Sequence, residues 1–76
     1  MDAQNILNAL GGKANIKYLD SCITRLRITL TDMSLLNERA LKAEGAVGIM
    51  KLGGGNIQVV IGTEAEIIEQ EIKDLM

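Results

Sequence analysis

The sequence contains no histidine, proline, tryptophan or phenylalanine, and Tyr18 is its single aromatic residue. Its core therefore has to be built from Leu, Ile, Val, Ala and Met. Because histidine is missing, the chain cannot form the cysteine–histidine pair of an acyl-transfer site. Cys22 is the only cysteine, which excludes an internal disulfide and fits a reducing compartment such as the cytosol.

Long apolar runs and an excess of positive charge are also absent. Runs such as VVI at positions 59–61 are far shorter than the about 18 residues of a membrane span. We therefore expect a soluble chain with neither a membrane helix nor a signal segment. The net charge of -2 and the acidic pI of about 4.9 argue against a nucleic-acid partner, because such surfaces need clustered Lys and Arg.

Three segments place apolar residues at the helical spacing of three and four. The first covers residues 2–10 and is followed by two glycines that stop it. The second follows Asp32 and Ser34, either of which is a suitable N-cap. The third is predicted to begin with a capping box formed by Thr63 and Glu66. The expected apolar stripes are Ala3, Ile6, Leu7 and Leu10, then Leu36, Ala40 and Ala43, then Ala65, Ile68, Ile72 and Leu75.

Four segments are typical of strands. The alternation is complete over residues 25–31 and weaker over 15–19. Residues 46–52 and 57–61 flank the sequence GGGN, whose glycines allow the positive φ angles of a hairpin turn. One side of the clearest strand carries Leu26, Ile28 and Leu30, and its other side carries Arg25, Arg27, Thr29 and Thr31. In the weakest strand, we expect Ile16 and Tyr18 to lie on the same side.

The predicted order of elements is α-β-β-α-β-β-α. Strands joined by short loops pair antiparallel, and three one-sided helices can cover one face of a four-stranded sheet. We therefore expect an α+β fold in which three helices cover one face of a four-stranded antiparallel sheet. No linker, repeat or change of composition divides the chain, so residues 1–76 should form a single domain.

Cys22 lies in the segment DSCITRLR. The first strand is expected to end near Leu19 and the second to be under way by Arg25, which places the cysteine in the connecting loop and exposes it. Arg25 and Arg27 should project from the same face, with Cα atoms about 6.5 Å apart. The Thr24 hydroxyl and the backbone N–H groups of a tight loop would add donors for an anion.

The charges around this cysteine predict a basic patch in an acidic protein. Residues 13–27 carry four cations against Asp20 alone, whereas the rest of the chain has an excess of acid. Cationic neighbours favour a thiolate, and guanidinium groups match phosphoryl oxygens. A phosphorylated cysteine, an oxidation-sensing thiol that needs a second thiol from elsewhere, and an inert core residue all remain open on these grounds.

The segment LDSCITRLRITLTD, with GG and NI shortly before it, resembles the active-site region of the enzyme IIB domain of the bacterial phosphoenolpyruvate-dependent sugar phosphotransferase system, glucose type. The resemblance extends over nearly the whole chain through NALGGKANI, LKAEGAVGIMKLG and QVVIGTEAEII. Related beta-glucoside-type and sucrose-type domains usually have a histidine ahead of the cysteine. Asp20 and Ser21 stand there instead, which favours the glucose, N-acetylglucosamine and maltose branch.

The resemblance implies that Cys22 accepts a phosphoryl group from the phosphohistidine of a IIA domain. It would pass this group to a sugar held by a membrane-embedded IIC domain, so the chain would work in the cytoplasm at the inner face of the membrane. Arg25 and Arg27 would neutralise the transferred group, with support from Thr24, Ile23 and Asp20. No cofactor or metal is expected.

Two alternatives accompany this interpretation. Ile23 is either an apolar contact for the partners or a side chain turned into the core. The whole domain could instead be a regulatory or interaction module of the same fold, with a redox-sensitive thiol or an inert one. The sugar cannot be identified from these residues, because the resemblance assigns it to the IIC domain.

Overall fold

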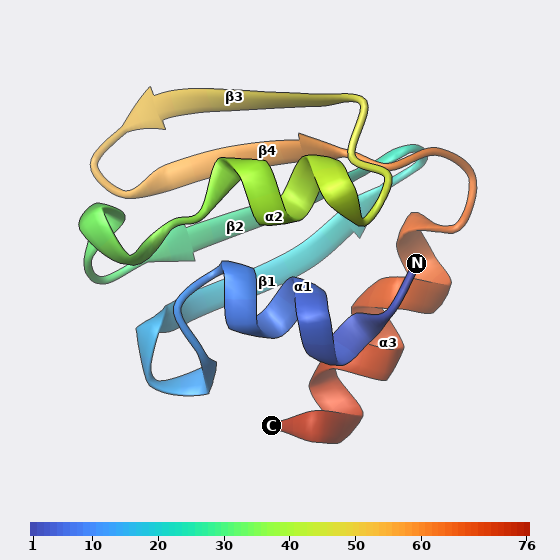
Figure 1. The fold of residues 1–76 in the computed structure, drawn as a ribbon, viewed down its shortest axis with the longest axis horizontal. Coiled ribbons are helices and arrows are strands. Elements are labelled where there is room, and N and C mark those ends of the chain that lie inside the picture. Colours follow the sequence, from blue (N-terminus) through green and yellow to red (C-terminus); the bar gives the residue numbers. More distant parts are fainter.

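Two β-hairpins join into one antiparallel sheet, and the helices all lie on one face of it (Figure 1). The computed structural model describes residues 1–76. The strands follow the spatial order β1-β2-β4-β3, and the order of helices and strands along the chain is the predicted one. The strands are β1 (Ile16–Cys22), β2 (Arg25–Leu30), β3 (Gly48–Gly53) and β4 (Asn56–Val60), and the helices are α1 (Ala3–Ala9), α2 (Glu38–Ala43) and α3 (Ala65–Leu75).

The core lies between the sheet and the helices and contains no aromatic ring. It consists of 15 buried aliphatic residues, and the two central strands supply five of them. Leu26 lies opposite Val59, and Ile28 lies opposite Ile57. The other face of the sheet carries no helix, so strand residues of the opposite parity remain open to solvent.

A β-bulge changes which side chains of β1 face the core. Ile16 pairs with Leu30, but the next pair is Tyr18 with Thr29, so the register shifts by one residue between them. As a result Leu19 is buried and Tyr18 is 53% exposed. The prediction that Ile16 and Tyr18 share a side is therefore wrong: Ile16 packs against the core and Tyr18 lies on the open face.

The second helix is shorter than predicted. The Asp32 side chain accepts the Ser34 N–H and closes a 3-10 turn (Met33–Leu35), after which the chain becomes extended at Leu36. Asn37 then caps α2 by accepting the Ala40 N–H. Because the helix begins later than expected, its buried residue is Leu41 and not Ala43, which is exposed.

The last helix lacks the predicted capping box. Its N-cap position is held by Glu64, which makes no side-chain capping bond, because the first turn begins one residue later than the Thr63–Glu66 pattern requires. The Ala65 N–H is accepted by the carbonyl of Gly62 instead. Ala65, Ile68 and Ile72 are buried as expected, whereas Leu75 in the final turn is 46% exposed.

The β3–β4 turn confirms the predicted hairpin and consists of Gly54 and Gly55. Gly55 has φ +81° and its carbonyl accepts the Leu30 N–H at 2.8 Å. A Cβ at this position would lie 2.2 Å from the Leu30 carbonyl oxygen. Only glycine permits this close approach, which holds the hairpin turn against the end of β2.

Candidate functional site

Cys22 is the last residue of β1, and the prediction that it lies in the connecting loop is wrong. The strand is longer than expected because its pairing with β2 continues to the Cys22–Arg25 pair. Only Ile23 and Thr24 form the turn. The thiol is exposed, as predicted.

The register places the cysteine and both arginines on the open face of the sheet. Arg25 lies directly opposite Cys22, and Arg27 lies opposite Asp20. Opposed residues of an antiparallel pair project on the same side, and so do residues two apart on one strand. The neighbouring strand β4 adds Gln58, which lies opposite Arg27.

These residues surround a shallow surface hollow of about 310 Å³. The structure thus brings together five of the six residues that the sequence predicts for the site, and the sixth, Asp20, binds Arg27 beside it. Sequence reasoning missed Gln58, because nothing in the local pattern shows that β4 pairs with β2. The lining residues are Cys22, Ile23, Thr24, Arg25, Arg27 and Gln58.

Each arginine is held by a different acceptor. The Nη1 of Arg25 donates to Oε1 of Gln58 at 2.7 Å. Arg27 donates from Nε and Nη2 to the two carboxylate oxygens of Asp20, at 2.8 and 2.7 Å. This two-point contact aligns the guanidinium with the carboxylate, so the orientation of Arg27 follows that of Asp20.

The Asp20–Arg27 pair shifts both ionisation equilibria. The hydrogen bond from Arg27, followed by one from Tyr18, lowers the pKa of Asp20 from 3.8 to about 2. The bond to Asp20 raises the pKa of Arg27 above its ordinary value, and the nearby Cys22 contributes a further attraction when it is negatively charged. Arg27 also lines the hollow of Cys22, where its guanidinium can act on a negative charge.

The β1–β2 turn has an unusual backbone. Ile23 is the only non-glycine residue with positive φ, at 56°, and its side chain is 85% exposed. This conformation is strained for a β-branched residue. The carbonyl of Thr24 accepts N–H groups from Ile61 and Gly62, both at 2.9 Å, which fixes the turn to the end of β4. Of the two orientations considered for Ile23, the structure has the outward one.

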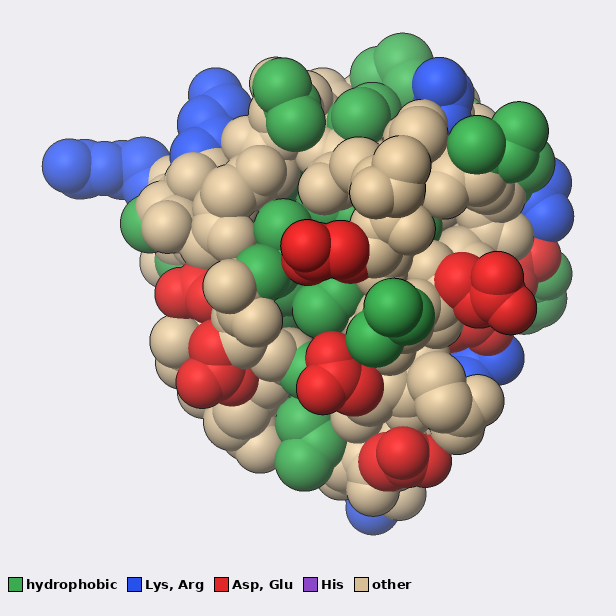
Figure 2. Space-filling model, turned by 90° about the vertical axis from the view of Figure 1, so that its right-hand side faces the viewer, with side chains coloured by type: hydrophobic (Ala, Val, Ile, Leu, Met, Phe, Trp, Pro, Cys, Tyr) green, Lys and Arg blue, Asp and Glu red, His purple; other side chains and the backbone are tan.

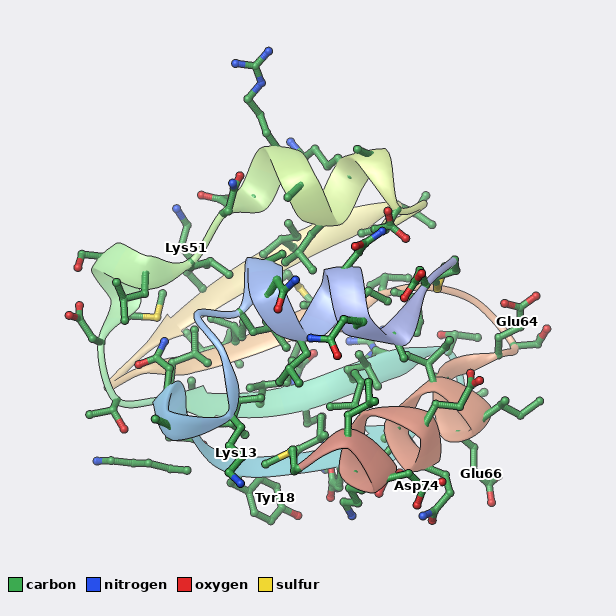
Figure 3. All side chains as sticks on the ribbon, turned by 60° about the horizontal axis from the view of Figure 1, so that its bottom comes forward. Lys13, Tyr18, Lys51, Glu64, Glu66 and Asp74 are labelled. Atoms are coloured by element: carbon green, nitrogen blue, oxygen red, sulfur yellow. The ribbon has the colours of Figure 1, made fainter.

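The basic patch predicted from residues 13–27 does not gather around the cysteine. Lys13 lies in the turn before β1 (Figure 3). Cys22 is the last residue of that strand. The seven residues of β1 span roughly 20 Å at about 3.3 Å per residue, so the two ends of the strand lie far apart. The cations that line the hollow of Cys22 are Arg25 and Arg27. Asp and Glu side chains are spread over the end of the molecule that carries the N-terminus and the loop before α3 (Figure 2).

Ser21 ties the opposite side of this strand end to a helix. Its hydroxyl donates to Oε1 of Glu69 in α3 at 2.6 Å, and Lys73 donates to the other oxygen of the same carboxylate. The strand residue next to the cysteine is thus fixed from the helical face. No group of three or more Cys, Asp or Glu side chains is arranged to hold a metal ion. The longest helix has 11 residues, and none combines the length and apolarity needed to cross a bilayer.

The comparisons with known proteins agree with the resemblance. Residues 4–37 match the family model described as phosphotransferase system, EIIB. The N-acetylglucosamine-specific EIIB component of Streptomyces coelicolor is 53% identical over 74 residues, which are 97% of this chain and 95% of that protein. The chain therefore belongs to the EIIB family of the phosphotransferase system. As an EIIB domain it is a phosphotransferase component of sugar transport.

Other relatives are much longer. The maltose-specific EIICB component of Escherichia coli is 51% identical over 71 residues, which are 93% of this chain and 13% of that protein. The N-acetylglucosamine-specific EIICBA component of Klebsiella pneumoniae is 43% identical over 74 residues, 97% of this chain and 11% of that protein. The chain thus spans about an eighth of their length.

A solved structure shares the fold. One domain of the PTS system IIABC component from Clostridium difficile superposes with a TM-score of 0.76 at 24% identity, covering 97% of this chain and 77% of that one.

Proposed function

We propose that Cys22 is the residue that carries the phosphoryl group. Its thiolate attacks the phosphorus of a phosphohistidine on a IIA domain, so an S–P bond forms as the P–N bond breaks. A sugar hydroxyl on a IIC domain then attacks the same phosphorus, the S–P bond breaks, and the thiolate is restored. The hydroxyl proton goes to a base on the acceptor side, since this chain has no histidine.

One observation carries this proposal: the exposed sulfur of Cys22 shares a hollow with two guanidinium groups on the uncovered face of the sheet. Phosphoryl transfer depends chiefly on positioning and on neutralising charge spread over three oxygens. Arg25 and Arg27 supply the charge from the strand opposite the cysteine. Thr24 lies at the rim of the same hollow, where its hydroxyl can add a donor.

The two partners have to reach Cys22 in turn. The names EIICB and EIICBA of the longer relatives indicate EIIC and EIIA parts in the same proteins. We propose that this chain meets such domains at the cytoplasmic face of the membrane. Ile23, at the tip of the turn, would give both partners an apolar contact beside the reacting sulfur. Contacts that must form and release in every cycle are expected to be small and short-lived.

Intact-mass measurement tests the carrier role. The chain is incubated with phosphoenolpyruvate, the general phosphotransferase proteins and an N-acetylglucosamine-type IIA domain. We expect one added phosphoryl group on the wild type and none on Cys22→Ala. A matched control moves the thiol by one residue in the double variant Ser21→Cys, Cys22→Ser. Because Ser21 contacts α3 on the helical side, the displaced thiol should not be phosphorylated.

Transfer onward is measured with membranes that contain the IIC domain of the same system and labelled N-acetylglucosamine. Loss of label transfer in Cys22→Ala is expected. If competent IIA domains leave the wild type unmodified while mild peroxide oxidises Cys22 reversibly, the carrier role is wrong and the redox module is favoured.

A further inference from the structure

Tyr18 makes a contact that the proposed relay does not yet use. Its hydroxyl donates to Oδ2 of Asp20 at 2.5 Å. The bulge at the start of β1 puts Tyr18 on the open face, two residues before Asp20 and four before Cys22 on the same side of the strand. The only aromatic residue of the chain thus lies outside the core, with its polar end directed at the carboxylate that holds Arg27.

The carboxylate of Asp20 is held at both oxygens. Oδ1 accepts from Nε of Arg27, and Oδ2 accepts from Nη2 of Arg27 and from Tyr18. The phenol therefore restrains the rotation of the carboxylate about its side-chain bonds. Without Tyr18, only the arginine would determine how that carboxylate is turned.

Restraint matters here because the ion pair lies near the surface. The side chains of Arg27 and Asp20 are 49% and 24% exposed, and exposed pairs between flexible side chains hold their geometry weakly. Arg27 has five N–H groups and gives two of them to Asp20. The others stay available to an anion, and the same side chain lines the hollow of Cys22.

The packing of Tyr18 does not explain its position. Its side chain is half exposed and lines a second shallow hollow on the open face together with Arg27, Thr29 and Asn56. The ring is absent from the buried cluster that stabilises the fold. Its one directed contact is the hydrogen bond to Asp20.

We infer that Tyr18 is a positioning residue for phosphoryl transfer, which acts through Asp20 to hold Arg27 in the orientation that receives the phosphoryl group on Cys22. This inference rests on the proposed function. Tyr18 touches neither the sulfur nor the phosphoryl group. Its hydrogen bond reduces the conformational freedom of the Asp20–Arg27 pair before the phosphoryl group arrives, so the pair loses less conformational entropy during transfer.

The first test is independent of phosphorylation. The side-chain Nε–H of Arg27 gives a proton–nitrogen NMR signal whose exchange with water reports how firmly it is held. In Tyr18→Phe, which keeps the ring, this exchange should become at least about threefold faster, as expected for the loss of one neighbouring hydrogen bond. The matched control is Arg25, whose acceptor is Gln58 and whose signal should not change.

The second test is a double-mutant cycle on the rate of sugar phosphorylation. Tyr18→Phe should slow transfer about three- to tenfold in the wild-type background, with the effect on kcat and not on KM for the IIA domain. In an Arg27→Gln background the same change should have no further effect, because the residue through which Tyr18 acts is gone. Thermal unfolding of Tyr18→Phe should remain cooperative, as expected of an intact fold.

Two results would overturn the inference. One is unchanged Arg27 exchange together with unchanged transfer in Tyr18→Phe. The other is an equal loss of transfer in both backgrounds, which would mean that Tyr18 acts without Arg27. If the wild type itself takes up no phosphoryl group, the carrier role of Cys22 fails, and the NMR measurement still decides whether Tyr18 holds Arg27.

Discussion

Arg25 and Gln58 are 33 residues apart in sequence and form a 2.7 Å hydrogen bond from Nη1 to Oε1. The bond joins the strand that begins beside Cys22 to a strand of the second hairpin. The orientation of one arginine of the CITRLR segment therefore depends on a residue far outside that segment. Gln58 also lines the hollow of Cys22, so its amide lies where it can influence the site directly.

Replacing Gln58 tests this dependence. In Gln58→Leu, Arg25 loses its acceptor, and sugar phosphorylation should slow about three- to tenfold, the loss expected of one hydrogen bond. In Gln58→Glu, the new carboxylate should hold Arg25 but repel the incoming phosphoryl group, so the rate should fall further. Single-turnover transfer from a phosphorylated IIA domain measures both. A faster rate in the Glu variant would refute the electrostatic argument.

The arginines themselves should be needed for transfer and not for folding. Arg25→Gln or Arg27→Gln removes a charge-assisted contact to the phosphoryl group, worth about 1.5–3 kcal/mol, so transfer should slow at least about tenfold. Arg39→Gln, on the exposed side of α2, is the matched control and should be neutral. Circular dichroism and thermal unfolding should show an intact fold in each variant. Wild-type transfer rates in both site variants would assign the arginines to another task.

Acidification should reveal the Asp20–Arg27 pair. The pKa of Asp20 is lowered from 3.8 to about 2, so the stabilisation from this group is fully present above pH 3.8 and is lost as the pH falls through about 2. The carboxyl carbon of Asp20, followed by NMR, should titrate near pH 2. Its midpoint should rise in Arg27→Gln and rise less in Tyr18→Phe, because the Arg27 bond is the larger cause.

A control distinguishes this pair from general effects of charge. Lys73 also acts on Asp20 through its charge, but more weakly. Lys73→Gln should therefore move the midpoint less than either variant at Arg27 or Tyr18. A midpoint near 3.8 in the wild type would show that the pair does not persist in solution.

Substitutions at Ile23, the strained residue of the β1–β2 turn, should change stability and activity in different ways. Glycine at position 23 relieves the positive φ of Ile23, a gain of about 1–2 kcal/mol that the flexibility of glycine reduces by about 0.5–1 kcal/mol. Ile23→Gly should therefore be as stable as the wild type or slightly more so. It should nevertheless accept phosphoryl groups more slowly, because it lacks the exposed apolar side chain that we propose contacts IIA.

Chemical denaturation and the KM for the phosphorylated IIA domain provide the two measurements. Ile23→Asn is a second variant, since asparagine tolerates positive φ and is polar. An unchanged KM in both variants would remove Ile23 from the docking contact.

The glycine hairpin should be sensitive at one of its two turn positions. A Cβ on Gly55 would lie 2.2 Å from the Leu30 carbonyl oxygen, whereas the nearest atom to a Cβ on Gly54 is 3.6 Å away. Gly55→Ala should cost more than about 2 kcal/mol of unfolding free energy, and Gly54→Ala only about 1–2 kcal/mol for its positive φ. Urea unfolding measures both. Equal costs would mean that the approach of β2 to this turn is not tight.

The sequence predicts β2 and the β3–β4 hairpin well, because alternation and glycine-rich turns act over a few residues. It predicts the second helix poorly, since two capping residues, Asp32 and Asn37, compete within six positions and only packing decides which one begins α2. The bulge that turns Tyr18 outward also escapes a pattern of strict alternation.

The residues of the site also divide into those that local patterns predict and those that depend on strand pairing. The position of Arg25 and Arg27 on one face follows from a parity argument, whereas the place of Cys22 at the end of β1 does not, because the local pattern does not show that the strand continues past Leu19. Gln58 and the exposed contact of Tyr18 depend on which strands pair and with what register, and no local signal reports that. The prediction that Lys13 lies near Cys22 is wrong for a related reason: an extended strand lies between them, and a strand advances about 3.3 Å per residue.

The strand order β1-β2-β4-β3 also has a kinetic meaning. Each hairpin closes through contacts that are local in sequence, which form quickly, whereas pairing β2 with β4 closes a loop that includes α2. Gln58 reaches Arg25 only at that step. In a chain that has formed both hairpins but has not yet joined them, Cys22 would be exposed and the arginine site would be incomplete. The ability to accept a phosphoryl group should therefore appear late during refolding, together with the last long-range contacts.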